Sequence, residues 1–207
     1  MLNLLLAATL LHTPTADAAP KRDQAHLQVQ TGMLSREALR VEETDHEHRE
    51  VQAGPGAGGV SMGLGYQLRA HSEVGGRLEL SRATVSDGIS DVQQGHARVA
   101  GTYTHYFPVA APVHFAATAM LGLERSSFDG AAIARGPFVG ASGNLHWFVA
   151  SRVSLHAGVE ATRSLGGRFE QDGLDGSSRF VATDIAAVAG MNFFVGTKNR
   201  SPKARRR

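Results

Sequence analysis

The most restrictive feature of this sequence is a two-residue alternation of side-chain polarity. In the segment 152–162, RVSLHAGVEAT, every second residue from Val153 is apolar, and the intervening residues are Ser, His, Gly, Glu and Thr. Successive side chains of a β-strand point to opposite faces, so the segment predicts a strand with one apolar and one polar face. The polar face carries His156 and Glu160. These two residues are either a catalytic pair or part of the polar interior of a barrel.

The same alternation recurs along the chain and predicts eight strands. The expected strands cover residues 26–35, 57–69, 72–85, 95–107, 112–126, 135–150, 152–165 and 179–195. Many of them reach the roughly 9–11 residues that a tilted strand needs to cross a bilayer. No long segment shows a helical period, and the fold class is therefore predicted to be all-β.

The connections between these strands alternate in length. The short ones have the sequences RAH, PVAAP and SR, and the long ones cover residues 36–56, 86–94, 127–134 and 166–178. Long outer loops that alternate with tight periplasmic turns are typical of bacterial outer-membrane barrels. We therefore predict an eight-stranded antiparallel up-and-down transmembrane β-barrel with both ends in the periplasm.

The composition of the polar faces indicates that they point inward. The only lysines are Lys21, Lys198 and Lys203, whereas a soluble domain usually spreads lysine over its surface. Gly, Ser, Thr, Asn, His, Glu and Arg on the polar faces suit the interior of an eight-stranded barrel, which side chains just fill. The alternative is a soluble, secreted, lipocalin-like barrel whose apolar faces surround a small apolar ligand.

The inward polar side chains of such a barrel would form a network in its lumen. Buried charges must pair, because an unpaired charge costs several kcal/mol. Arg77 and Arg98 would be the cations of this network, which would plug any pore. The predicted members are Arg77, Glu79, Arg98, His114, Glu124, His146, His156, Glu160 and Asp184.

Aromatic residues on the apolar faces lie near the short turns or near the end of the last strand. They would form an aromatic girdle at the periplasmic membrane interface. The predicted members are Tyr66, Tyr103, Phe107, Trp147 and Phe193. A second girdle near the long loops is poorly populated.

The two ends of the chain differ from its body. An apolar run over residues 4–11 precedes Ala16-Asp17-Ala18, which predicts a signal peptide over residues 1–18 and an exported barrel domain over residues 19–196. A buried N-terminal helix is the alternative. Residues 197–207 form a basic tail with six cations, so the rest of the chain is slightly acidic although the net charge is +2. In the periplasm this tail would contact anionic envelope polymers, and nucleic acid is not an expected partner.

Catalysis has little support in the sequence. A barrel hydrolase that acts on lipid needs a serine nucleophile within reach of a histidine base. Ser154 and His156 share a face, but residues two apart in a strand are about 6–7 Å apart, and both would point away from the lipid. We therefore expect no catalytic residues and no enzyme activity.

Two acidic segments bear on metal binding. The segment 41–50, VEETDHEHRE, carries carboxylates and imidazoles that could bind a divalent metal, although a charged solvent-facing loop explains it more simply. In the segment 171–178, QDGLDGSS, Asp172 and Asp175 lack the later glutamate of a calcium loop, and Asp-Gly pairs favour turns. We expect no metal and no cofactor, and the absence of cysteine excludes disulfides.

Signal peptide, strand number, alternation and loop order together resemble the small eight-stranded outer-membrane β-barrel proteins, the OmpA/OmpX-like superfamily. The segment GMNFFVG, with Phe193 and Phe194, resembles the terminal aromatic signal for barrel insertion in that family, but here a basic tail follows. The resemblance implies a barrel in the outer membrane of a Gram-negative bacterium, in contact with outer-membrane lipid. It also implies a structural or adhesion-like role in which the long loops meet extracellular surfaces. Some barrel lipases resemble this fold, but we find no match to their His–Ser–Asn pattern in the sequence.

Overall fold

The computed structural model describes residues 20–41, 46–53, 59–86, 91–129, 132–171 and 178–196. Ten strands lie in these ranges: β1 (Gln24–Val41), β2 (His46–Ala53), β3 (Val60–Arg69), β4 (Ser72–Ser86), β5 (Asp91–Ala110), β6 (Val113–Phe128), β7 (Ala132–Ala150), β8 (Val153–Ser164), β9 (Gly167–Gln171) and β10 (Ser178–Gly196). Within these residues, no helix is long and apolar enough to cross a membrane. The predicted signal peptide and basic tail lie outside the described residues.

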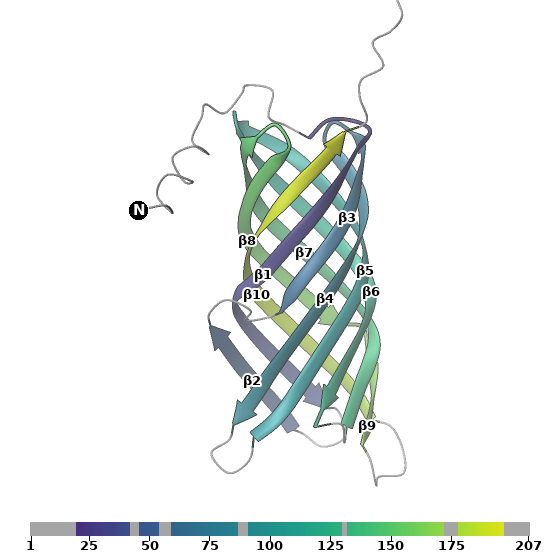
Figure 1. Ribbon diagram of the computed structural model, residues 1–207. Coiled ribbons are helices and arrows are strands. Elements are labelled where there is room, and N and C mark those ends of the chain that lie inside the picture. Colours follow the sequence, from purple (N-terminus) through teal and green to yellow (C-terminus); the bar gives the residue numbers. More distant parts are fainter. Residues whose placement is uncertain are drawn as a thin grey trace, which may run out of the picture.

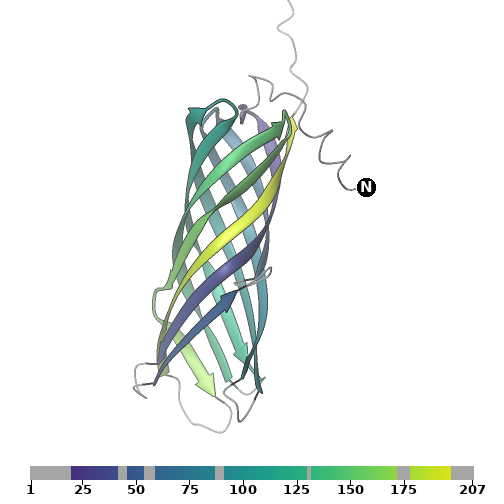
Figure 2. The ribbon, with the colours of Figure 1, turned by 90° about the vertical axis from the view of Figure 1, so that its left-hand side faces the viewer.

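Eight of the strands close into a barrel (Figure 1). Their order is β1-β3-β4-β5-β6-β7-β8-β10, and a long antiparallel pairing between β1 and β10 closes the ring. Figure 2 shows how steeply the strands tilt around the barrel axis, as closure of an eight-stranded sheet requires. The predicted eight-stranded antiparallel barrel is confirmed.

The two remaining strands extend the wall at the end away from the short turns. β2 pairs with the outer half of β1, from Leu34 to Val41. β9 continues β8 after a short break at Leu165 and Gly166, where Gly166 has a φ of 90°, and it pairs with both β7 and β10. The left-handed region suits glycine because it has no Cβ.

The prediction that residues 36–56 and 166–178 are loops throughout is therefore wrong. β1 continues to Val41, and β2 and β9 lie within the two predicted loops. The loops predicted at 86–94 and 127–134 are also shorter than expected, because β5 begins at Asp91 and β7 at Ala132. These extensions carry many polar residues on both faces, so hydrophobic alternation does not reveal them.

The apolar faces of the strands point outward. Leu64 on β3 is 70% exposed and Leu121 on β6 is 62% exposed, although both lie well inside their strands. On the same strands, the polar residues Ser61, Gln67 and Glu124 are buried inside the barrel. The alternative of a soluble barrel with an apolar ligand cavity is therefore wrong, because the faces have the opposite orientation.

One end of the barrel carries the short turns. The turns at residues 70–71, 111–112 and 151–152 join neighbouring strands there. β1 begins and β10 ends at the same end, which is at the top of Figure 1. The breaks between β1 and β2, between β4 and β5, between β6 and β7 and between β9 and β10 lie at the opposite end, which we call the long-loop end.

Candidate functional site: the barrel lumen

A layer of ion pairs crosses the lumen. The register aligns Glu79 of β4 with Arg98 of β5, and Arg98 with Glu124 of β6, so alternation turns all three side chains inward. Arg98 is only 6% exposed, and its guanidinium lies 3.2 Å from Glu79, 3.3 Å from Glu124 and 3.2 Å from Asp184 on β10. Arg98 therefore joins strands from both sides of the barrel.

The second cation, Arg77, completes this charge layer. Its guanidinium donates hydrogen bonds of 2.8 Å to Glu79 and 2.5 Å to Glu160 on β8. Gln30 of β1 donates to Glu160 at 3.3 Å, and Ser164 donates to Glu124. The two guanidinium groups thus link all four carboxylates of the layer.

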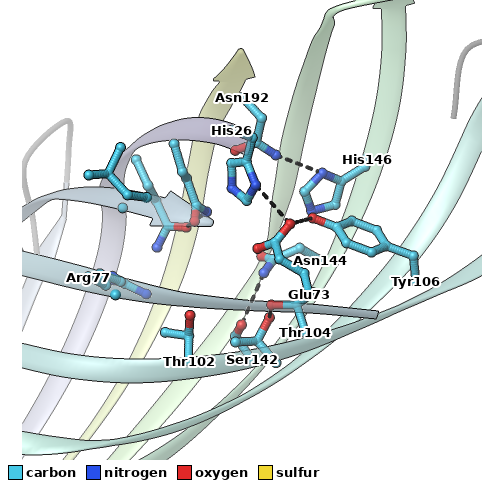
Figure 3. Close-up of a pocket in the computed structure, with 16 residues that line it drawn as sticks. His26, Glu73, Arg77, Thr102, Thr104, Tyr106, Ser142, Asn144, His146 and Asn192 are labelled. Carbon is cyan, nitrogen blue, oxygen red and sulfur yellow. Dashed lines mark hydrogen bonds and ion pairs between the residues drawn. The ribbon is translucent and has the colours of Figure 1, made fainter. Parts of the chain in front are cut away.

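A polar layer lies between the charge layer and the short turns (Figure 3). His146 and His156 stack with ring centroids 5.0 Å apart. The Asn192 amide donates to His146 Nδ1 at 3.0 Å, and His156 Nε2 lies 3.1 Å from the Gln30 side-chain oxygen. A cavity of about 30 Å³ remains beside these side chains, next to Thr104, Tyr106, Ser142 and Asn144. Such a space holds roughly one or two waters and no larger ligand.

A third group of side chains closes the lumen near the short turns. Glu73 is 3% exposed; it accepts hydrogen bonds from Gln67 at 2.8 Å and Tyr106 at 3.2 Å, and its carboxylate lies 2.7 Å from His26 Nδ1. The rings of Phe148 and Phe194 have centroids 5.4 Å apart, and Phe194 contacts the His26 ring. His114 packs against Phe148 with ring centroids 5.3 Å apart.

None of Gln67, Glu73, Tyr106 or His26 was predicted as a lumen residue. The spacing could have identified two of them. His26 is an even number of residues from Gln28 and Gln30, and Glu73 is an even number of residues from Arg77 and Glu79, so each shares a strand face with other polar residues. All four residues lie within two residues of an end of a predicted strand, where the alternation gives the weakest indication of a face.

The lumen becomes apolar toward the long-loop end. Phe138 is 2% exposed and packs with Ala100 and Met120, and the Arg98 guanidinium lies over its ring, 5.4 Å from the centroid. Beyond it, Phe180 packs with Ala134 and Ala182. The interior is therefore filled by side chains from the short turns to the level of β9.

No protein-family model and no curated protein sequence matches the chain. The fold nevertheless has counterparts among solved structures. Neisserial surface protein A (NspA) aligns over 82% of this chain and 96% of its own, with a TM-score of 0.57 and 12% identity. The outer membrane protein AlkL aligns over 87% of this chain and 94% of its own, with a TM-score of 0.52 and 9% identity. This chain has the fold of a small outer-membrane β-barrel.

The five aromatic residues predicted as a girdle all lie on the outer wall of this outer-membrane barrel. Their exposed fractions range from 41% for Phe193 to 48% for Tyr103, and each lies in the half of its strand that is nearer the short turns. Tyr66 donates to Asp23 at 3.2 Å and Tyr103 donates to Ser72 at 3.3 Å. Each tyrosine thus combines an apolar ring with a polar contact, which suits a membrane interface.

The interior of the outer-membrane barrel contains two serine–histidine contacts that the sequence did not reveal: His96 Nδ1 lies 2.7 Å from Ser126 Oγ on the neighbouring strand, and the second contact involves Ser154. Ser154 Oγ lies 3.4 Å from His146 Nδ1 on the neighbouring strand, not next to His156, and the Asn192 amide donates to both. In a catalytic triad, the third residue orients the imidazole through the nitrogen opposite the nucleophile. Here the serine and the asparagine contact the same nitrogen. All three residues are at least 97% buried inside the barrel, where a lipid cannot reach them.

Two acidic segments were considered as metal sites, although no metal was expected. The side chains of residues 41–50 and the segment 172–177 lie outside the described residues. Within the residues that are described, no group of three or more His, Asp or Glu side chains has an arrangement that could hold a metal ion.

Proposed function

We propose that this outer-membrane barrel is a structural and surface-contact protein, with no enzyme activity and with a lumen that does not conduct. The charge layer carries this proposal. Arg77 and Arg98 link β4, β5, β6, β8 and β10 across the interior, so the polar side chains act as a plug that ties the wall together. A buried network of this kind favours one rigid arrangement, because breaking any pair leaves an uncompensated charge.

The filled lumen supports the absence of conduction. The cavity of the polar layer is about 30 Å³, and aromatic and apolar side chains close the interior on both sides of it. We expect planar bilayers that contain the purified protein to show no steady current steps in 1 M KCl, with a general porin as the positive control. Steady unitary currents that depend on the amount of inserted protein would contradict the proposal.

The contact surface would lie at the long-loop end. β2 extends the wall along Leu34–Val41 of β1, and β9 extends it between β7 and β10. Strand extensions of this kind can present side chains away from the membrane, which supports an adhesion-like role. At the other end, the composition of residues 197–207 supports contact with anionic envelope polymers.

Attachment of whole cells tests the surface role. A non-adherent Gram-negative host that expresses the chain is expected to attach to plates coated with matrix proteins more than the same host with an empty vector. Replacing residues 38–49, the outer part of the β1–β2 hairpin, by a short Gly-Ser turn should abolish the gain. Heat-modifiable migration on a gel must show that the variant barrel still folds. Equal attachment of the folded variant and the wild type would argue against a contact role for this hairpin.

A further inference from the structure

A row of arginines crosses the outer wall near the long-loop end. The register places Arg125 of β6 opposite Arg135 of β7, Arg135 opposite Arg168 of β9, and Arg168 opposite Arg179 of β10. All four residues are exposed, so their side chains lie on the outside of the barrel. Direct cross-strand partners have Cβ atoms roughly 4.5–5.5 Å apart, so four positive side chains stand side by side across four strands.

Within the described residues, one ion pair lies along this row. Arg135 donates to Glu170 at 2.8 Å, and both side chains are about half exposed. In the described part of the chain, Arg125, Arg168 and Arg179 have no carboxylate within ion-pair distance. Like charges directly opposite each other destabilise a sheet. Among the described residues, four cations thus stand against one carboxylate, and an anion along the row would relieve the repulsion between them.

The row begins next to the apolar band of the outer wall. Leu123 precedes Arg125 by two residues on β6 and is 62% exposed, and Leu165 precedes Arg168 by three residues and is 54% exposed. Two residues along a strand span about 7 Å. The arginines therefore lie just beyond the apolar band, at the depth where lipid headgroups follow the hydrocarbon chains. The long arginine side chain can extend further toward a headgroup.

We propose that Arg125, Arg135, Arg168 and Arg179 form a binding site for the phosphate groups of anionic lipid in the leaflet at the long-loop end. The planar guanidinium donates two parallel hydrogen bonds to a phosphate, and several neighbouring guanidinium groups can hold a headgroup that carries more than one phosphate. The occupant is a lipid and not a soluble polyanion, because the row lies on the side wall beside the apolar band. This site is separate from the lumen and from the proposed β1–β2 contact surface.

Lipid binding to the purified full chain in neutral dodecyl maltoside micelles tests the site. The probes are lipid A, which carries two phosphates, and the same lipid with both phosphates removed. We expect the wild type to bind the phosphorylated lipid at least about tenfold more tightly, with a preference that falls as salt rises. R125Q/R135Q/R168Q/R179Q should lose this preference. R22Q/R69Q/R152Q, which removes exposed arginines at the short-turn end, should keep it.

Two further measurements make the outcome decisive. Heat-modifiable migration checks that the quadruple variant folds. If it does not fold, R168Q and R179Q are measured singly, and each should weaken binding of the phosphorylated lipid about two- to threefold. A preference for phosphate that survives in all of these variants would overturn the site. If a heparin oligosaccharide or inorganic phosphate binds the row as tightly as the phosphorylated lipid, a soluble anion is the occupant and the lipid assignment is overturned.

Discussion

Replacing Arg98 by methionine is expected to destabilise the barrel by about 3–5 kcal/mol, which is the usual effect of removing one partner from a buried ion-pair network. Arg98 contacts Glu79, Glu124 and Asp184, so its loss leaves three carboxylates in the lumen without their shared cation. Urea unfolding in micelles measures the effect. Trp147 is the only tryptophan and reports the transition by fluorescence.

Two matched variants separate the charge from the change in packing. R98M/E79Q/E124Q/D184N removes the carboxylate charges as well, and should recover most of the lost stability because neutral groups cost less to bury. R163M changes an exposed arginine on the outer wall and should lie within about 0.5 kcal/mol of the wild type. If R98M and R163M unfolded at the same urea concentration, the lumen network would not stabilise the fold.

Replacing Leu121 by arginine is expected to cost about 2–4 kcal/mol in a bilayer, because a charge on the lipid-facing side of a barrel is least favourable near the midplane. Leu121 is 62% exposed and lies in the middle of β6. The matched change V195R affects a residue that is 64% exposed at the end of β10, where the cost should be only about 0–1 kcal/mol.

Urea titration of folding into lipid vesicles compares the two variants. A large difference between L121R and V195R is expected only if lipid covers the exposed leucine. In water both changes would be nearly neutral, since exposed surface substitutions rarely exceed about 0.5 kcal/mol. Equal stabilities of the two variants would therefore mean that the outer wall does not face lipid.

The sequence was sufficient to predict the barrel because each strand of a membrane barrel needs apolar side chains on its lipid-facing side and polar side chains on its inner side. The alternation over residues 113–124 and 153–162 shows which side chains share a face of the strand. The same two-residue spacing assigned Arg77, Arg98 and Glu124 to the interior. Where the chain leaves the apolar region, this constraint ends. β2, β9 and the outer part of β1 were missed for that reason.

Contacts between strands were harder to predict than faces. Ser154 shares its face with His156, but the register brings His146 and Asn192 to it instead. Register depends on turn lengths and bulges, such as the shift between Phe148 and Ala150, which alternation does not encode. The arginine row was not predicted for the same reason, because Arg125, Arg135, Arg168 and Arg179 lie on four strands and become neighbours only through the register of their pairing.

The seam between β1 and β10 also determines when the barrel loses its open sheet edges. The first and last strands of the barrel pair along almost their entire length, and until β10 is in place both β1 and β8 expose unpaired backbone. Such edges invite pairing with other chains. Contacts between residues so distant in the sequence form slowly, because a long loop must close before they can form. Only the pairing of β1 with β10 removes both of these edges, so an incomplete barrel keeps two sites at which a second copy can pair.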